Sequence, residues 1–186
     1  MEPETQEETK KKGGLWEFVR SIIIALLIVI PIRAWVAQPF IVQGNSMVPN
    51  FHHGEYLIID ELSYFFRQPQ RGEVIVFRYP LDPRQFFIKR VVGLPGERVE
   101  IKDGKVLVKK ADGTENVWLE ESYLSDSVKT EGVTVLVLGR GDYFVLGDNR
   151  TQSSDGRAWG ALPRHLIVGR AVFRAWPVYK LGLVNK

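Results

Sequence analysis

The sequence predicts a mainly β domain that follows one N-terminal transmembrane helix. An apolar span occupies residues 15–36, and short apolar runs separated by turn residues fill the chain from residue 40 onward. No long helical periodicity interrupts those runs. With 45% hydrophobic and 25% charged residues in a chain of 186, the composition is that of a folded globular protein.

The first 37 residues divide into a polar tail and an apolar anchor. Residues 1–14 are rich in Glu and Lys and contain almost nothing to bury, so we expect a disordered tail. Residues 15–37 are the expected anchor, because a helix over residues 15–36 would be about 33 Å long and a hydrocarbon core is about 30 Å thick. Only residues 21–32 lack an ionisable group, so Arg20 and Arg33 would have to reach opposite interfaces.

Two alternatives to an uncleaved anchor are a cleaved secretory signal and a buried helix of a soluble protein. A cut after Ala37 would leave bulky Trp35 at a position where signal cleavage requires a small side chain. Basic residues at 10–12 and 20 precede the span, whereas Arg33 is the only basic residue between it and Arg67. The charge bias therefore predicts a single-pass cell-membrane protein with a cytoplasmic N-terminus and an extracytoplasmic domain over residues 38–186.

Within that domain, alternating apolar runs have the length and composition of β-strands. The candidate strands lie at residues 56–60, 73–77, 86–92 and 99–110, and in two runs that follow Gly132 and Gly141. Asp103 and Gly104 divide the 99–110 run into two alternating halves, which indicates a β-hairpin. Residues 111–130 show the weakest pattern, and we interpret them as an insertion or loop between strands.

Composition and motif spacing exclude several kinds of site. The chain has no cysteine, so disulfides and thiolate chemistry are absent, and its net charge of +3 is not concentrated in a basic, aromatic surface for nucleic acid. His52, His53 and His165 lie in polar contexts without a surrounding motif. The acidic residues at 147–157 alternate with arginines and do not have the spacing of a calcium loop, so we expect no metal and no cofactor.

Lys89 lies inside the apolar run FFIKRVVG, next to Arg90. Alternation along a strand places Phe87, Lys89 and Val91 on one face, so one of the two adjacent cations must face the apolar side. Burial favours the neutral amine, and shifts of about 3 to 5 pKa units are documented for fully buried lysines. A snorkelling lysine is the alternative that the run alone leaves open.

Ser46 lies in a Gly-Asn-Ser-Met turn shortly after the apolar span. A serine in such a turn is more often a turn or cap residue than a nucleophile, and a serine hydroxyl needs an adjacent base to attack a carbonyl. Local sequence therefore gives a physical reason to single out Lys89 but not Ser46.

Four segments taken together carry a more specific signal. They are GNSMVP at residues 44–49, RGEVIVFRYP at 71–80, FIKRVVGLPGE at 87–97 and GDNRTQSSDGR at 147–157. In content and order they resemble the bacterial signal peptidase I family, and the resemblance extends from the anchor over nearly all of the domain. It implies the complex antiparallel β-sheet protease fold of that family.

The resemblance also implies roles for individual residues. Ser46 would be the nucleophile, Lys89 its general base, and Ser153 rather than Ser154 the serine that orients the lysine amine. The backbone N–H of Ser46 would stabilise the oxyanion. Some members supply a second donor from a hydroxyl two residues upstream, where this chain has Gly44.

Further residues would support the site or contact the substrate. The expected structural supports are Arg90, Asp148, Asn149, Arg150, Asp155 and Arg157, with Arg90 a natural partner for Asp148. The candidate walls of substrate pockets are Phe40, Val42, Met47 and Ile88, for which core packing is an equal explanation. This chain departs from the common family pattern at Asn50, where threonine is frequent, and at Gly156, where many members have serine.

The resemblance implies a membrane serine endopeptidase that removes signal peptides from exported preproteins after a small residue. Its partners would be those signal peptides, extended beside residues 40–43, and the lipid bilayer. Trp159 and Trp176 are candidate interfacial contacts, for which core packing is an equal explanation. Two other readings stay open at this point. One is a self-cleaving repressor-type protease with the same Ser-Lys dyad, and the other is a membrane-tethered β-domain that binds without catalysis.

Overall fold

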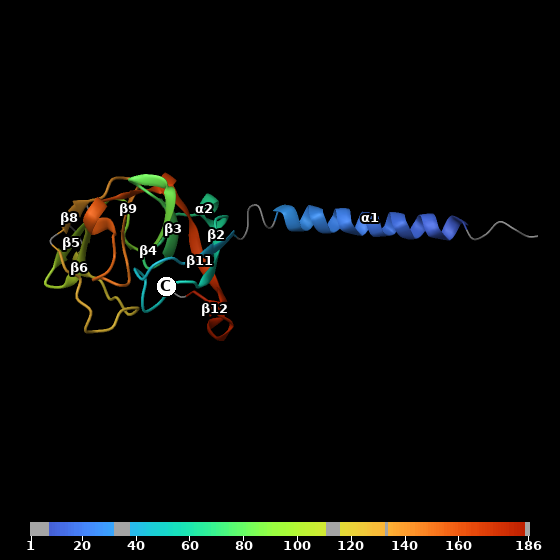
Figure 1. The fold of residues 1–186 in the computed structure, drawn as a ribbon. Helices are drawn as coiled ribbons and strands as arrows, with labels where there is room; N and C mark the ends of the chain where they lie inside the picture. The colour runs from blue at the N-terminus through green and yellow to red at the C-terminus, as the bar shows by residue number, and fades with distance from the viewer. Residues whose placement is uncertain (1–7, 32–37, 111–115, 133, 185–186) are drawn as a thin grey trace, which may run out of the picture.

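The structure is a computed structural model that describes residues 8–31, 38–110, 116–132 and 134–184. An N-terminal helix, α1 (Glu8–Pro31), precedes a domain built almost entirely from antiparallel strands (Figure 1). The predicted mainly β fold is therefore confirmed. Within the described ranges, no helix combines the length and the apolar character needed to cross a membrane.

Helix α1 begins earlier than the sequence predicted. The tail expected to be disordered is helical over residues 8–14, where Glu and Lys have high helix propensity and extend the helix of the apolar segment. Residues 1–7 of that tail, and residues 32–37 of the expected anchor, lie outside the described residues.

The larger of the two sheets has eight strands. Its strand order is β1-β2-β11-β3-β4-β9-β10, with β12 paired to β11. The strands are β1 (Gln38–Ile41), β2 (Tyr56–Asp60), β3 (Val74–Tyr79), β4 (Asp82–Gly93), β9 (Asp142–Leu146), β10 (Leu162–Pro163), β11 (Ile167–Trp176) and β12 (Gly182–Leu183). Short helical turns connect them: α2 (Ser63–Phe66), α3 (Gly156–Trp159), η2 (Arg164–Leu166) and η3 (Val178–Lys180).

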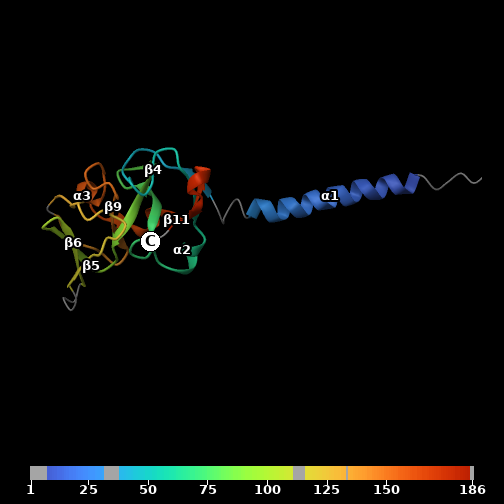
Figure 2. The ribbon, with the colours of Figure 1, turned by 90° about the horizontal axis from the view of Figure 1, so that it is seen from below.

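The smaller sheet has four strands in the order β7-β6-β5-β8 and lies at the side of the domain away from β1 and β2 (Figures 1 and 2). Its strands are β5 (Glu97–Lys102), β6 (Lys105–Lys110), β7 (Asn116–Trp118) and β8 (Thr134–Val137). Asp103 and Gly104 form the predicted β5–β6 turn with φ of 54° and 77°, the left-handed pair that a tight hairpin requires. Strand β7 lies in the segment that we expected to be a loop.

Three clusters of buried apolar side chains hold the domain together, one of which lies directly beneath the turn that contains Ser46. This cluster joins Met47 and Phe51 from that turn to Leu57 and Ile59 of β2 and to Val76 of β3. All five side chains are nearly inaccessible to solvent. Burial on this scale contributes about 1.5 to 3 kcal/mol per large side chain, so the turn is anchored by packing on both sides of Ser46.

Candidate active site

Ser46 and Lys89 meet although 43 residues separate them. Ser46 lies in the turn between β1 and β2, and Lys89 lies on β4, where its neighbour Ile88 pairs with Val76 of β3. The Lys89 amine donates a hydrogen bond to Ser46 Oγ at 2.8 Å and another to the carbonyl oxygen of Ile88, also at 2.8 Å. A hydroxyl and an amine at this distance have the geometry of a nucleophile and its general base.

The lysine amine is almost completely removed from water. Lys89 is only 4% exposed, and burial lowers its pKa from 10.5 to about 8, although the carboxylates of Asp155 and Asp148 oppose the shift. The amine also lies 5.3 Å above the ring of Phe87, on the same face of β4. A substantial fraction of Lys89 is therefore neutral near pH 8 and can accept a proton.

This pKa gives a first testable prediction, which concerns the pH dependence of the reaction. Only the neutral amine can accept the Ser46 proton, so kcat/KM should rise with pH through about 8 and level off above it. The measurement is the rate of peptide-bond cleavage in a peptide substrate between pH 6 and pH 10. A flat profile across this range, in a protein that stays folded throughout, would contradict Lys89 as the titrating base.

Residues 147–149 pack against the turn that carries Ser46 and hydrogen-bond to it. The backbone N–H of Asn149 donates to Ser46 O at 3.0 Å, and its side-chain amide donates to Asn45 O at 3.1 Å. A Cβ at Gly147 would lie 2.5 Å from Ser46 O and would also collide with Ser153 Oγ. Gly147 therefore permits the close approach of two chain segments, a role that our sequence analysis did not assign to it.

Ser153 lies beside this segment but forms no hydrogen bond with the lysine amine. Its hydroxyl oxygen is buried and makes no hydrogen bond of ordinary geometry within the described part of the chain, although it contributes to a lowered pKa at Asp155. The structure thus does not provide the Ser153–Lys89 hydrogen bond that the resemblance implied. Ser154, by contrast, is exposed and faces the groove described below.

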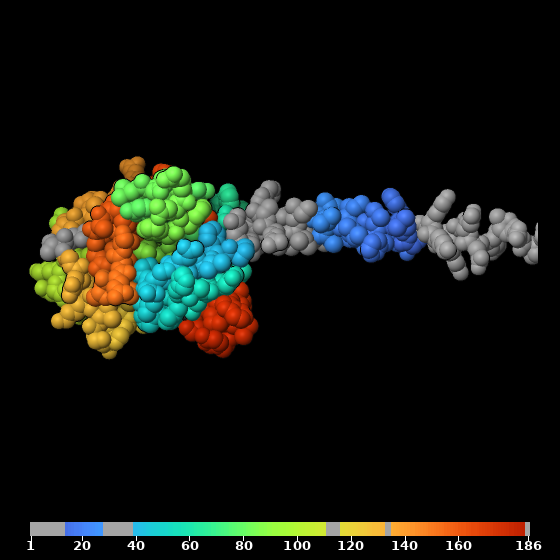
Figure 3. Space-filling view, viewed as in Figure 1, coloured from blue at the N-terminus to red at the C-terminus, as the bar shows by residue number. Residues whose placement is uncertain are grey.

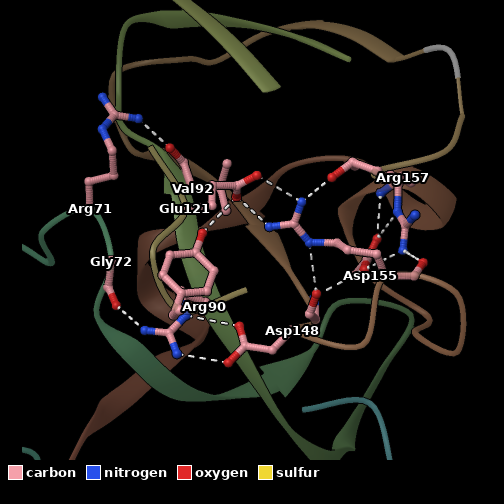
Figure 4. A network of polar contacts seen from close by, with 12 residues as sticks. Arg71, Gly72, Arg90, Val92, Glu121, Asp148, Asp155 and Arg157 are labelled. Atoms are coloured by element: carbon pink, nitrogen blue, oxygen red, sulfur yellow. Dashed lines mark hydrogen bonds and ion pairs between the residues drawn. The ribbon is translucent and has the colours of Figure 1, made fainter. Parts of the chain in front are cut away.

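The predicted supports form two buried ion pairs next to the catalytic pair (Figure 4). Arg90 grips Asp148 with two hydrogen bonds, Nε to Oδ1 at 2.9 Å and Nη2 to Oδ2 at 2.7 Å, and both side chains are at most 2% exposed. Arg157 Nε donates to Asp155 Oδ1 at 2.8 Å. Burial opposes ionisation of Asp155, but hydrogen bonds from Arg157 and from the Gly147 N–H outweigh it and lower the pKa of the carboxyl.

Arg150 is buried too, and its partner comes from an unexpected place. Its guanidinium pairs with Glu121 and donates to Thr130, both in the segment that the sequence left as a loop. The nitrogen Nε of Arg150 donates to Gly147 O at 3.1 Å. The segment after β7 is therefore attached to the site, which nothing in its amino-acid pattern indicated.

An open groove of about 740 Å³ passes in front of Ser46 and Lys89. On the face viewed in Figure 3, the cyan surface of β1 and the turn after it borders the green surface of β4 and the orange surface of the chain beyond residue 150. Phe40, Val42 and Ile88, three of the candidate pocket walls, line the groove, and Val42 and Ile88 also belong to the buried core cluster below the turn. Met47 does not line it: this side chain is 1% exposed and belongs to the core cluster below the turn.

The oxyanion side of the site carries no side chain at Gly44. The Gly44 N–H donates to His53 Nδ1 at 3.2 Å, a contact that the polar sequence around His53 did not predict. Besides Ser46 and Lys89, the polar side chains along the groove are Gln43, Asn45, Gln85, Gln152 and Ser154. Across the described segments, no group of three acidic or histidine side chains is placed to hold a metal ion.

Comparison with known proteins decides the family. Residues 15–176 match the family model described as signal peptidase, peptidase S26. The chain belongs to this family.

Two relatives named signal peptidase I match this chain over most of both lengths. It is 36% identical over 183 residues to a signal peptidase I of Leptolyngbya laminosa, with 94% of this chain and 86% of that protein covered. It is 32% identical to a signal peptidase I of Bacillus licheniformis, with 92% and 94% covered. A crystal structure of a signal peptidase I from Enterococcus faecalis V583 aligns with a TM-score of 0.47 and 31% identity, over 56% of this chain and 97% of that one.

The resemblance inferred from the four motifs is therefore confirmed, and the chain is a serine endopeptidase of the signal peptidase family. Membership decides against the repressor-type protease and against a β-domain that only binds.

Proposed function

We propose that this chain removes signal peptides from exported preproteins, with Ser46 as nucleophile and Lys89 as general base. The observation that carries the proposal is the 2.8 Å hydrogen bond between Lys89 Nζ and Ser46 Oγ, made by a buried amine. Because the Lys89 amine is buried among apolar side chains, it needs no histidine or acid to be neutral at a mildly basic pH.

The proposed reaction proceeds in two acyl-transfer steps. The neutral Lys89 amine takes the Ser46 proton as Oγ bonds to the scissile carbonyl carbon, and the backbone N–H of Ser46 donates to the resulting oxyanion. Collapse of this intermediate breaks the C–N bond, and the Lys89 ammonium gives its proton to the leaving amine. Water then attacks the acyl-enzyme with Lys89 again as base, which releases the signal peptide and restores Ser46.

The substrate would bind as an extended strand in the groove. Among the described strands, β1 pairs only with β2, so its other edge is free, and β4 residues 86–88 pair only with β3. A peptide between these edges could hydrogen-bond to the backbone on either side. Apolar side chains of Phe40, Val42 and Ile88 would leave room only for small residues next to the scissile bond.

We further propose that the N-terminal helix anchors the chain in the cell membrane, with its N-terminus in the cytoplasm and the protease domain outside. The support is the uncharged stretch of residues 21–32 and the basic residues that precede it. Four strongly exposed apolar side chains, at 62% to 83%, add support for a lipid partner. They are Phe65 and Phe66 of α2 and Val178 and Tyr179 of η3, at the end of the domain that also carries β1 and β2 (Figures 1 and 2).

The proposed function is tested with a membrane-inserted preprotein that has alanine at the first and third positions before the cut. The purified full-length chain should release a mature protein. Its N-terminus, determined by mass spectrometry, should lie directly after the alanine at the first position before the cut. Replacing either alanine by tryptophan should slow cleavage at least about 100-fold, because a large ring cannot enter a pocket shaped for a methyl group.

The control is a tryptophan at the second position before the cut, where an extended chain directs the side chain away from the same wall of the groove. This preprotein should be cleaved within about threefold of the alanine version. Equal rates for all the preproteins, or no cleavage of any of them, would overturn the assignment of this groove to small-residue signal peptides.

A further inference from the structure

The segment that follows β7 is tied to the catalytic site by three arginines that lie on or next to catalytic elements. The ring of Tyr123 covers the Arg90 guanidinium at 3.9 Å from its centroid, and Glu121 pairs with Arg150. Arg157 donates to the carbonyl oxygen of Glu131 at 3.2 Å. Residues 119–131 therefore pack against the arginines of the two buried ion pairs, and Figure 4 shows Glu121 within this cluster of polar contacts.

Asn50 connects this segment to the nucleophile turn. Its side-chain amide Nδ2 donates to Asp148 Oδ2 at 2.8 Å and to the carbonyl oxygen of Tyr123 at 2.9 Å, so both amide hydrogens are used. Its own carbonyl accepts from Arg174 Nη2 at 2.5 Å. Asn50 follows Ser46 by four residues, and Asp148 is the partner of Arg90, which follows Lys89 directly on β4.

We propose that Asn50 and Tyr123 act together as positioning residues that fix the Ser46 turn relative to the Lys89 strand. This inference rests on the proposed function, since it assigns positions to the groups of that reaction. Neither residue lines the groove, so neither contacts the substrate. They join the two catalytic elements through Asp148 and Arg90, independently of the hydrogen bond between Ser46 and Lys89.

Two features of the junction make it suited to positioning. Asp148 and Arg90 are almost fully buried, and their planar two-point contact fixes the orientation of both groups. Asn50 adds a third hydrogen bond to the same carboxylate, and the Tyr123 ring closes the other face of the guanidinium. A shift of about 1 Å in a reacting group can cost about 100-fold in rate, so a rigid connection of this kind affects kcat rather than KM.

The experiment measures kcat and KM of the full-length protein for a preprotein substrate in Asn50→Ala, Tyr123→Ala and the double variant. We expect each single variant to lower kcat at least about tenfold with KM unchanged. The kcat of the double variant should be no lower than that of the less active single variant. Tyr123→Phe keeps the ring and the backbone carbonyl and should stay within about twofold of wild type. Asn116→Ala, an exposed asparagine on β7, is the matched control.

A second readout separates positioning from a loss of folded protein. With the enzyme in saturating excess over the preprotein, the single-turnover rate constant does not depend on the fraction of enzyme that is folded. A loss of positioning in Asn50→Ala or Tyr123→Ala should therefore lower this rate constant at least about tenfold, which partial unfolding cannot cause. Tyr123→Ala carries the test if Asn50→Ala does not fold.

The outcomes distinguish this inference from the proposed function. If wild type cleaves the preprotein but Asn50→Ala and Tyr123→Ala keep its kcat, or their effects multiply in the double variant, the positioning role is wrong and the function stands. A single-turnover rate constant equal to that of wild type in both Asn50→Ala and Tyr123→Ala also overturns it. If wild type cleaves no preprotein, the proposed function itself fails.

Discussion

A Ser46→Ala variant is expected to lose processing of preproteins altogether, with a fall in kcat on the order of a millionfold. Alanine removes the oxygen that forms the acyl-enzyme while leaving the groove and its apolar walls in place, so KM or peptide affinity should change little. Lys89→Met should fall to the same level, because a serine hydroxyl without a base is a weak nucleophile. The double variant should fall no further, since the two groups act as one unit.

The measurement is single-turnover cleavage with excess enzyme, followed by mass spectrometry of the products. Ser127→Ala and Lys105→Ala are matched controls, because both side chains are exposed and lie away from the groove. The Ser-Lys dyad is refuted if a folded Ser46→Ala or Lys89→Met protein cleaves at a rate comparable with wild type.

Asp148→Ala is expected to lower the free energy of unfolding by about 3 to 5 kcal/mol. The substitution leaves the Arg90 guanidinium buried without its carboxylate partner, and removing one partner of a buried pair costs far more than the pair itself contributes. Asn50 also loses one of its two acceptors. Denaturant unfolding at neutral pH measures the change.

Asp126→Ala is the control, because Asp126 is exposed and should change stability by less than about 0.5 kcal/mol. Replacing both partners, as in Arg90→Met with Asp148→Leu, should recover much of the lost stability since no unpaired charge stays buried. A change below about 1 kcal/mol in Asp148→Ala would show that water or another carboxylate takes over as the partner of the Arg90 guanidinium.

The sequence predicted the local features that have a local physical cause. The β5–β6 hairpin follows from Asp103 and Gly104, which tolerate the left-handed conformation, and the low basicity of Lys89 follows from its apolar neighbours on β4. Strand β11 was missed, although it lies between β2 and β3 in the larger sheet. Its alternation is interrupted by Gly169 and two arginines, whose charges are met by acidic groups far away in the sequence.

Long-range contacts account for the rest of the differences. The attachment of Glu121 and Tyr123 to buried arginines depends on partners about 30 residues away in either direction, so the local composition of residues 111–130 resembles an ordinary loop. The orientation of Ser153 depends on how Gly147 and Ser46 approach each other, which no motif specifies. Met47 was assigned to the groove because it follows Ser46, but its side chain packs in the core below the turn.

The burial of Lys89 also lowers the free energy of unfolding at neutral pH. Below pH 8 its ammonium must be held in the interior, which opposes folding by about 3 kcal/mol, and this cost declines between pH 8 and 10.5 because the unfolded chain then binds the extra proton. Lys89→Met should therefore be inactive and more stable than wild type at pH 7.

The free edge of β1 has a consequence for which proteins this enzyme can serve. A sheet edge offers N–H and C=O groups that every polypeptide can satisfy, so attraction to it does not depend on the identity of the passing residues. Sequence information would enter only at the few positions where a side chain turns toward the wall of the groove. One active site can therefore process export signals that share almost no sequence, provided that they arrive unfolded and end in small residues.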